Sequence, residues 1–203
     1  MLLLASKSTE RKKLLESLRV ICESAESGLD EEALKQKLAV KNLTPIELAV
    51  ELALAKLKAT IDNYDTQKYA MVLTADTMIY IDKNTIFGKP KTAQEAKSML
   101  SKYSNNTHNV VTALAAYNPK TKATKTTTSV SKVTFKQLAP NDISCLLASQ
   151  EWKTAAGAYR IQGLAAKFID KTEGSYTGVI GLPADEFLKL AKDLKTEHSE
   201  IFY

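Results

Sequence analysis

The sequence predicts an α/β fold with a mixed sheet, and three features support this prediction. An apolar run at residues 2–5 resembles a buried strand and leads directly into a helix with an N-cap signal. Two later segments begin with capping boxes, in which a threonine is followed three residues later by a glutamate. Segments 108–117 and 123–138 are rich in strand-forming residues and predict a hairpin.

The predicted helices cover residues 9–19, 44–61, 92–102, 141–149 and 184–195. Ser8 is a favourable N-cap for the first helix, and Glu10 in its first turn complements the helix dipole. Thr44 and Glu47 form a capping box for the second helix, with a proline at its first position. This helix is apolar on most sides and should be largely buried. Pro183 precedes the last helix.

The predicted strands cover residues 2–5, 20–25, 69–75, 78–81, 108–117, 123–138, 159–161 and 167–170. Asp76 falls between two of these segments. It is therefore either a turn-initiating residue or a functional carboxylate at the end of an apolar strand, where open α/β sheets place their sites. Three glycines, at positions 174, 178 and 181, mark a loop before the last helix.

Composition limits the classes of function. A chain of 203 residues fits one domain or two small lobes that share a core. The net charge of +5 suits anionic ligands, although the basic residues are spread along the chain as on an ordinary solvated surface. Cys22 and Cys145 lie far apart and are expected to be reduced core residues. There is no signal-peptide pattern and no apolar run of about 18 residues, so a cytoplasmic protein without a membrane anchor is expected.

Basic and hydroxyl side chains follow the first strand. Ser6, Lys7, Ser8 and Arg11 surround a helix N-terminus, whose free N–H groups suit a phosphate. The loop lacks the glycines of a P-loop. A capped helix start with solvated charges is the alternative.

Carboxylates and lysines provide the other candidates. Asp30-Glu31-Glu32 is an acidic triplet that could bind a hard cation or simply be a solvated helix start. Lys56 lies on the mostly apolar helix, where its ammonium must reach solvent or an anion. Lys89, in a Gly-Lys-Pro turn, could be aimed at the same cleft as Asp76. The scattered cysteines and histidines argue against a zinc site, and no nucleophile elbow is present.

Taken together, these segments resemble the Maf family of nucleoside triphosphate pyrophosphatases. Residues 3–11 read L-L-A-S-K-S-T-E-R, similar to the family's L-A-S-x-S-P-x-R signature. An acidic pair, Asp30-Glu31, and the segments A-D-T and G-K-P follow in the same order as in the family. The later A-G-A-Y-R-I-Q-G resembles A-G-x-Y-x-I-Q-G, and the closing stretch to Pro183 is also similar.

The resemblance implies a single domain over residues 1–203, built as two lobes with a central cleft like that of inosine triphosphate pyrophosphatase. It implies hydrolysis of a nucleoside triphosphate to the monophosphate and pyrophosphate, with Mg²⁺ or Mn²⁺. Asp76 would be the general base, and Glu31 and Asp76 the metal ligands. The catalytic set would also include Lys89. Substrate binding would fall to Ser6, Ser8, Arg11, Lys56, Thr77 and Gln162. Thr77 and Gln162 match the branch that acts on dTTP and UTP.

Three positions depart from that branch. Thr9 replaces a proline, Glu10 stands where an arginine is usual, and Ala155 replaces a lysine. The last two changes remove cations near the nucleotide, so a preference for another base, such as a methylated one, stays open. A regulatory protein that binds nucleotides with weak turnover is the alternative. Stable nucleic-acid binding is not expected because no basic stripe is interleaved with aromatic residues. A homodimer stays open, as does the family's house-cleaning role.

Overall fold

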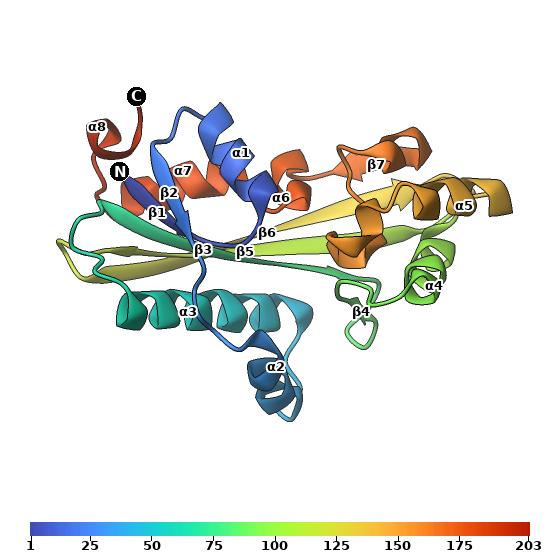
Figure 1. Cartoon of the computed structure of the whole chain (residues 1–203), viewed down its shortest axis with the longest axis horizontal. Coiled ribbons are helices and arrows are strands. Elements are labelled where there is room, and N and C mark those ends of the chain that lie inside the picture. Colours follow the sequence, from blue (N-terminus) through green and yellow to red (C-terminus); the bar gives the residue numbers. More distant parts are fainter.

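The computed structural model describes residues 1–197 and 199–203, and a long mixed sheet runs through it with helices on both faces (Figure 1). The strands are β1 (Leu2–Ala5), β2 (Cys22–Ala25), β3 (Met71–Tyr80), β4 (Ile86–Phe87), β5 (Thr107–Asn118), β6 (Ala123–Phe135) and β7 (Ile169–Glu173). The α-helices are α1 (Thr9–Ser17), α2 (Glu31–Ala39), α3 (Pro45–Asn63), α4 (Ala93–Tyr103), α5 (Pro140–Ala148), α6 (Tyr176–Ile180), α7 (Ala184–Asp193) and α8 (His198–Ile201).

The sheet is mixed, as the sequence predicts. Its strand order is β2-β1-β3-β5-β6-β7, and β4 pairs with the far end of β3. Strands β1, β2 and β3 are parallel to one another, whereas β3, β5, β6 and β7 form an antiparallel series. The predicted hairpin is β5–β6, joined in register from Thr107↔Thr134 to Asn118↔Ala123.

Each face of the sheet is covered by different helices (Figure 1). Helix α3 packs on one face, where Leu52, Ala53 and Leu57 join a core with Val72 of β3. Helices α1 and α7 cover the opposite face, and their apolar side chains share a second core with β1 and the other side of β3. Because successive residues of a strand point to opposite faces, β3 contributes alternately to the two cores.

A third core fills the end of the molecule at which α4 and α5 lie (Figure 1). Its centre is aromatic: the ring centroids of Tyr103 and His108 lie 4.3 Å apart, and Phe135 and Tyr159 pack against both. His108 is therefore a structural residue here, and its Nε2 lies 2.8 Å from the Tyr159 hydroxyl.

Several local predictions are wrong. The predicted break in the third strand does not exist, because β3 runs unbroken over ten residues and pairs with β5 from Val72 to Tyr80. Residues 159–161 form no strand, and β7 begins at Ile169 rather than 167. Both cysteines are free, as expected; Cys22 is partly buried and packs against the core, whereas Cys145 is exposed and is not a core residue. No helix in the described part of the chain is long and apolar enough to cross a membrane.

Candidate active site

The candidate site lies at an interruption in the sheet edge. Strand β1 pairs with residues 71–73 of β3, and β4 pairs with residues 79–80 on the same edge. Among the residues that the structure describes, no strand pairs with residues 74–78 on that edge, since β5 occupies the other one. Asp76 and Thr77 lie in the middle of this gap. Groups from both faces of the sheet can therefore reach one ligand there.

The structure corrects the predicted location of Asp76, whereas its role as a functional carboxylate stays a prediction. Asp76 initiates no turn and ends no strand; it lies within β3. It does lie just past the carboxyl end of β1, which is parallel to β3. The rule that open α/β sheets place sites beyond the carboxyl ends of parallel strands therefore applies to the β1–β3 pair.

Asp76 and Glu31 converge on Lys56. Lys56 Nζ lies 2.7 Å from Asp76 Oδ1 and 3.2 Å from Glu31 Oε1. The side chains of Lys56 and Asp76 are only 9% and 11% exposed, whereas that of Glu31 is 42% exposed. Two carboxylates from α2 and β3 thus share one ammonium from α3. The ammonium reduces the repulsion between the two carboxylates, of which Asp76 is mostly buried and Glu31 is partly exposed.

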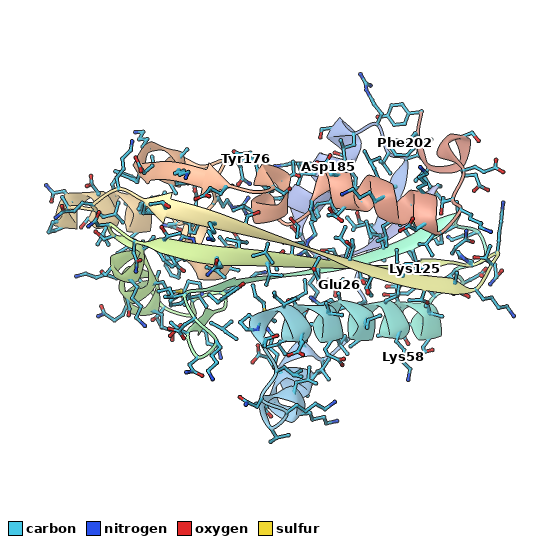
Figure 2. The ribbon with its side chains drawn as sticks, turned by 180° about the vertical axis from the view of Figure 1, so that it is seen from behind. Glu26, Lys58, Lys125, Tyr176, Asp185 and Phe202 are labelled. Carbon is cyan, nitrogen blue, oxygen red and sulfur yellow. The ribbon has the colours of Figure 1, made fainter. Side chains whose placement is uncertain are left out.

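Helix geometry explains why Lys56 points inward. It lies on the face of α3 that packs against β3, where Thr74 Oγ1 also donates a 2.7 Å hydrogen bond to the Ala53 carbonyl. Lys58, two positions further along, is on the outer face and points away from the sheet (Figure 2). Of the two outcomes expected for Lys56, contact with solvent or with an anion, the structure shows the second.

The carboxylate of Glu31 is presented by the start of α2. Asp30 is the N-cap of that helix, and its Oδ1 accepts a 3.0 Å hydrogen bond from Ala33 N. The acidic triplet is therefore divided in function. Asp30 caps the helix, Glu31 reaches Lys56, and Glu32 is exposed.

Arg11 reaches the gap from the opposite face of the sheet, the one covered by α1, and connects three segments there. Its Nε donates to the Gly181 carbonyl at 2.8 Å, its Nη1 to Ser6 Oγ at 3.0 Å, and its Nη2 to Thr77 Oγ1 at 3.0 Å. Burial lowers the pKa of Arg11, and the negative charges of Asp76 and Glu31 oppose that shift. The guanidinium nevertheless stays charged, because the pKa of arginine is far above neutral pH.

The direction of the hydrogen bond between the Thr77 and Thr112 hydroxyls, which lie next to Arg11, follows from their other partners. Thr112 Oγ1 donates to the Gly178 carbonyl at 2.8 Å, which uses its only proton. Thr77 must therefore be the donor in the 2.8 Å contact between the two threonine hydroxyls. Its remaining lone pairs accept from Arg11. Thr77 thus helps to hold the guanidinium in place.

The Ser6–Ser8 turn places two hydroxyls at the start of α1. Ser6 Oγ accepts from Ser8 N at 3.2 Å and from Arg11 at 3.0 Å. Ser8 Oγ accepts from Arg11 N at 3.4 Å as the N-cap. In these contacts both hydroxyls act as acceptors, so their protons can be donated to a phosphate oxygen.

Lys89 adds a third cation to the site. It follows β4, and desolvation together with the positive charge of Arg11 lowers the pKa of its ammonium, while Glu31 opposes the shift. Lys89, Arg11 and Lys56 therefore influence one another electrostatically. Three cations from three separate segments next to two carboxylates suit a polyanion that arrives with a metal ion.

Gln162 lies beside Glu10 at the start of α1. Gln162 Nε2 donates to Glu10 Oε2 at 3.0 Å, and Arg160 Nη1 lies 2.8 Å from Glu10 Oε1. Sequence reasoning treated Glu10 as a lost cation and did not consider Arg160. The only available signal was an arginine two positions before Gln162 in the A-G-A-Y-R-I-Q-G segment.

The carboxylate pair fits a divalent cation. Mg²⁺ is commonly held by one or two carboxylates together with substrate phosphate oxygens and water. Glu31 and Asp76 provide that number of carboxylates at one point, around a position where a positive charge already lies. Within the described residues, no group of three or more potential ligands gathers to form a closed protein cage. The donors present therefore suit a metal that is completed by its substrate.

Known proteins resemble this chain over nearly its full length. The family model described as "Maf-like protein" matches residues 1–194. A dTTP/UTP pyrophosphatase from Treponema denticola is 42% identical over 97% of each chain. Proteins of the same name from Geobacillus sp. (strain WCH70) and Aquifex aeolicus are 36% and 33% identical, and the matches cover 94% or more of each chain. The chain belongs to the Maf-like protein family.

Proposed function

We propose that this chain hydrolyses dTTP, UTP or a modified pyrimidine triphosphate to the monophosphate and pyrophosphate. The observation that carries the proposal is the convergence of Asp76 and Glu31 on the Lys56 ammonium, beside Arg11 and Lys89. The names of the relatives provide the substrate class. The proposal treats residues 1–203 as one catalytic domain.

The reaction needs an attacking water and a base to take its proton. Asp76 is the proposed base: one oxygen, Oδ1, accepts from Lys56, which leaves the other able to accept a proton from water. The water oxygen forms a bond to the α-phosphorus, and the bond from that phosphorus to the bridging oxygen breaks. Pyrophosphate leaves with the electron pair.

The cations would neutralise the triphosphate and hold it in line for this attack. Arg11 is already fixed by three hydrogen bonds, so little reorganisation accompanies the reaction. Ser6 and Ser8 would donate their hydroxyl protons to phosphate oxygens. Lys89, whose pKa is lowered, would gain a favourable partner when the polyanion arrives.

Glu31 and Asp76 would hold a divalent cation, Mg²⁺ or Mn²⁺. When bound, such an ion supplies Lewis-acid polarisation of the phosphoryl oxygens and lowers the pKa of a coordinated water. Lys56 would remain on Asp76 or shift toward the phosphates as the ion enters.

The regulatory alternative rests on the loss of positive charge at Glu10 and Ala155. However, Glu10 pairs with Arg160 at 2.8 Å, so its negative charge is compensated locally. A hydrolase remains the better interpretation of the site.

Pyrophosphate release tests the proposal. The purified full-length chain is incubated with dTTP, UTP, CTP and 7-methyl-GTP, each with Mg²⁺, with Mn²⁺ and with excess EDTA. We expect metal-dependent release of pyrophosphate from at least one pyrimidine triphosphate and none with EDTA. Binding of nucleotide without release from any of them would overturn the hydrolase and favour the regulator.

A further inference from the structure

Lys35 lies on the same face of α2 as Glu31. The two residues are four positions apart, a spacing that makes them neighbours on the surface of a helix. This face is directed inward, because Leu34 and the buried Leu38 pack in the core shared with α3, and Lys35 itself is half-buried. Lys37 is exposed on the outer face. The Lys35 ammonium therefore belongs to the side of α2 that brings Glu31 to the site.

Lys35 has no partner of opposite charge among the described residues. A glutamate followed four positions later by a lysine is the favourable order for an ion pair within a helix. The carboxylate of Glu31, however, lies 3.2 Å from Lys56 Nζ instead. A half-buried ammonium without a partner gives up part of its hydration without compensation, and an anionic ligand would supply that compensation.

Lys35 is also close enough to Lys89 to act on it. Burial is the main cause of the lowered pKa of Lys89, and nearby positive charges, that of Lys35 among them, lower it further. Lys89 follows β4, and Figure 1 shows β4 and α2 on the same side of the sheet as α3. Lys35 and Lys89 therefore border one region, although they come from elements far apart in the sequence.

Positive charge is in excess around this region. Four cations and two carboxylates act on one another there, which leaves a net charge of +2. They are Arg11, Lys35, Lys56 and Lys89, with Asp76 and Glu31. A field of this sign attracts a nucleoside triphosphate, which stays negative even when it carries one divalent cation. Removal of Lys35 would halve the excess.

We propose that Lys35 binds the β- and γ-phosphates of the triphosphate, the part that leaves as pyrophosphate. This inference rests on the proposed function, in which Asp76 and Glu31 act at the α-phosphorus. Lys35 is about 6 Å further along the axis of α2 than Glu31. Helix α2 extends away from β3, the strand that carries Asp76 (Figure 1). The ammonium of Lys35 is thus placed beyond the reacting phosphorus, on the side of the leaving group.

Calorimetric titration with inorganic pyrophosphate and Mg²⁺ tests this role without requiring turnover. The full-length wild type should bind pyrophosphate. Lys35→Met keeps an unbranched apolar side chain but loses the charge, and it should weaken this binding about tenfold or more, the loss expected for one charge-assisted contact. Binding of UMP should stay unchanged, because UMP carries only the α-phosphate. Lys35→Arg, which keeps the positive charge, should retain most of the pyrophosphate binding.

Lys37→Met is the matched control, because Lys37 is on the same helix but on its exposed face. It should bind pyrophosphate as the wild type does. Urea unfolding should give similar stabilities for Lys37→Met and Lys35→Met, which would show that α2 remains folded in both. In steady-state assays, Lys35→Met should raise KM for UTP by about the factor seen with pyrophosphate and leave kcat nearly unchanged.

Four results would overturn the inference: no binding of pyrophosphate by the wild type, unchanged binding in Lys35→Met, equal weakening of pyrophosphate and UMP, or the same weakening in Lys37→Met. Each of them leaves the hydrolase proposal intact as long as the wild type releases pyrophosphate from a triphosphate. Absence of that release would overturn the hydrolase proposal itself.

Discussion

Lys56 Nζ lies 2.7 Å from Asp76 Oδ1 in a pair whose two side chains are about one-tenth exposed. The ammonium comes from α3 and the carboxylate from the middle of β3, twenty positions apart in the sequence. Glu31 shares the same ammonium from a third element. An arrangement with two carboxylates and one lysine carries a net negative charge, which a divalent cation would reverse.

Replacing Asp76 with asparagine tests its role as the base. The amide has nearly the same size and still accepts from Lys56 through its oxygen, so the fold and nucleotide binding should be retained. It cannot take a proton from water, and kcat should fall about 10²-fold or more. Pyrophosphate release and calorimetric nucleotide binding provide the two measurements. Near-wild-type turnover would remove Asp76 from the role.

Replacing Lys56 with methionine should destabilise the protein. The change leaves Asp76 mostly buried and unpaired next to Glu31, at a cost of about 3 kcal/mol in the free energy of unfolding. The measurement is urea unfolding in EDTA. Because a divalent cation could take the place of the ammonium, millimolar Mg²⁺ should restore part of the loss. Lys58→Met, on the exposed face of α3, is the control and should change little (Figure 2).

Capping signals allowed several helices to be predicted from the sequence. Helix α3 begins at Pro45 after the Thr44 cap, and α4 begins at Ala93 after Thr92, close to the predicted starts. These signals are local, because the cap and the N–H group that it accepts from are only a few residues apart. Strand β3 was harder to predict. The polar residues around Asp76 suggested a break, but pairing with β5 from Val72 to Tyr80 overrides that local pattern.

The site was only partly predictable for the same reason. Lys56 alone suggested snorkelling, because its acceptors lie on β3 and α2 and no local pattern links them. The resemblance to a family brought these residues together in advance. It did not identify Arg160, whose partner Glu10 is 150 positions earlier. Each of the two looks like an ordinary surface charge until the fold places them 2.8 Å apart.

Gly181 should not tolerate a side chain. Its φ is +125°, a conformation that other residues rarely adopt, and a Cβ would lie 3.3 Å from Arg11 Nε and 3.4 Å from Thr77 Oγ1. Gly181→Ala should therefore lower the free energy of unfolding by about 1–3 kcal/mol. It should also displace Arg11 and raise KM for the triphosphate about tenfold, through the loss of a charge-assisted hydrogen bond.

Gly88→Ala is the matched control for this change. A Cβ at Gly88 would have no heavy atom within 4 Å, and the residue is in the Gly-Lys-Pro turn of the same site. Its stability and KM should stay near wild type. If Gly181→Ala and Gly88→Ala have the same free energy of unfolding and the same KM, the close approach of Gly181 to Arg11 does not matter for stability or for substrate binding.

His108 should make stability depend on pH. Burial lowers its pKa from 6.5 to about 3, and its Nδ1 has no hydrogen-bond partner in the described structure. In the unfolded chain the imidazole takes up a proton near pH 6.5, whereas in the folded chain it stays neutral until about pH 3. The unfolded state therefore binds more protons between these values. His108 therefore costs no stability above pH 6.5, and the free energy of unfolding falls as the pH drops from 6.5 towards 3.

Between pH 6 and pH 5 this linkage should remove about 1.2 kcal/mol from the free energy of unfolding. The measurement is urea unfolding at the two pH values in the wild type and in His108→Phe. The variant loses the hydrogen bond to Tyr159, so it should be less stable at both, but the His108 part of the slope should disappear. Equal slopes in the two proteins would mean that His108 takes up its proton in the folded state as easily as in the unfolded chain. In that case the aromatic core around Tyr103 would be more open to water than its packing indicates.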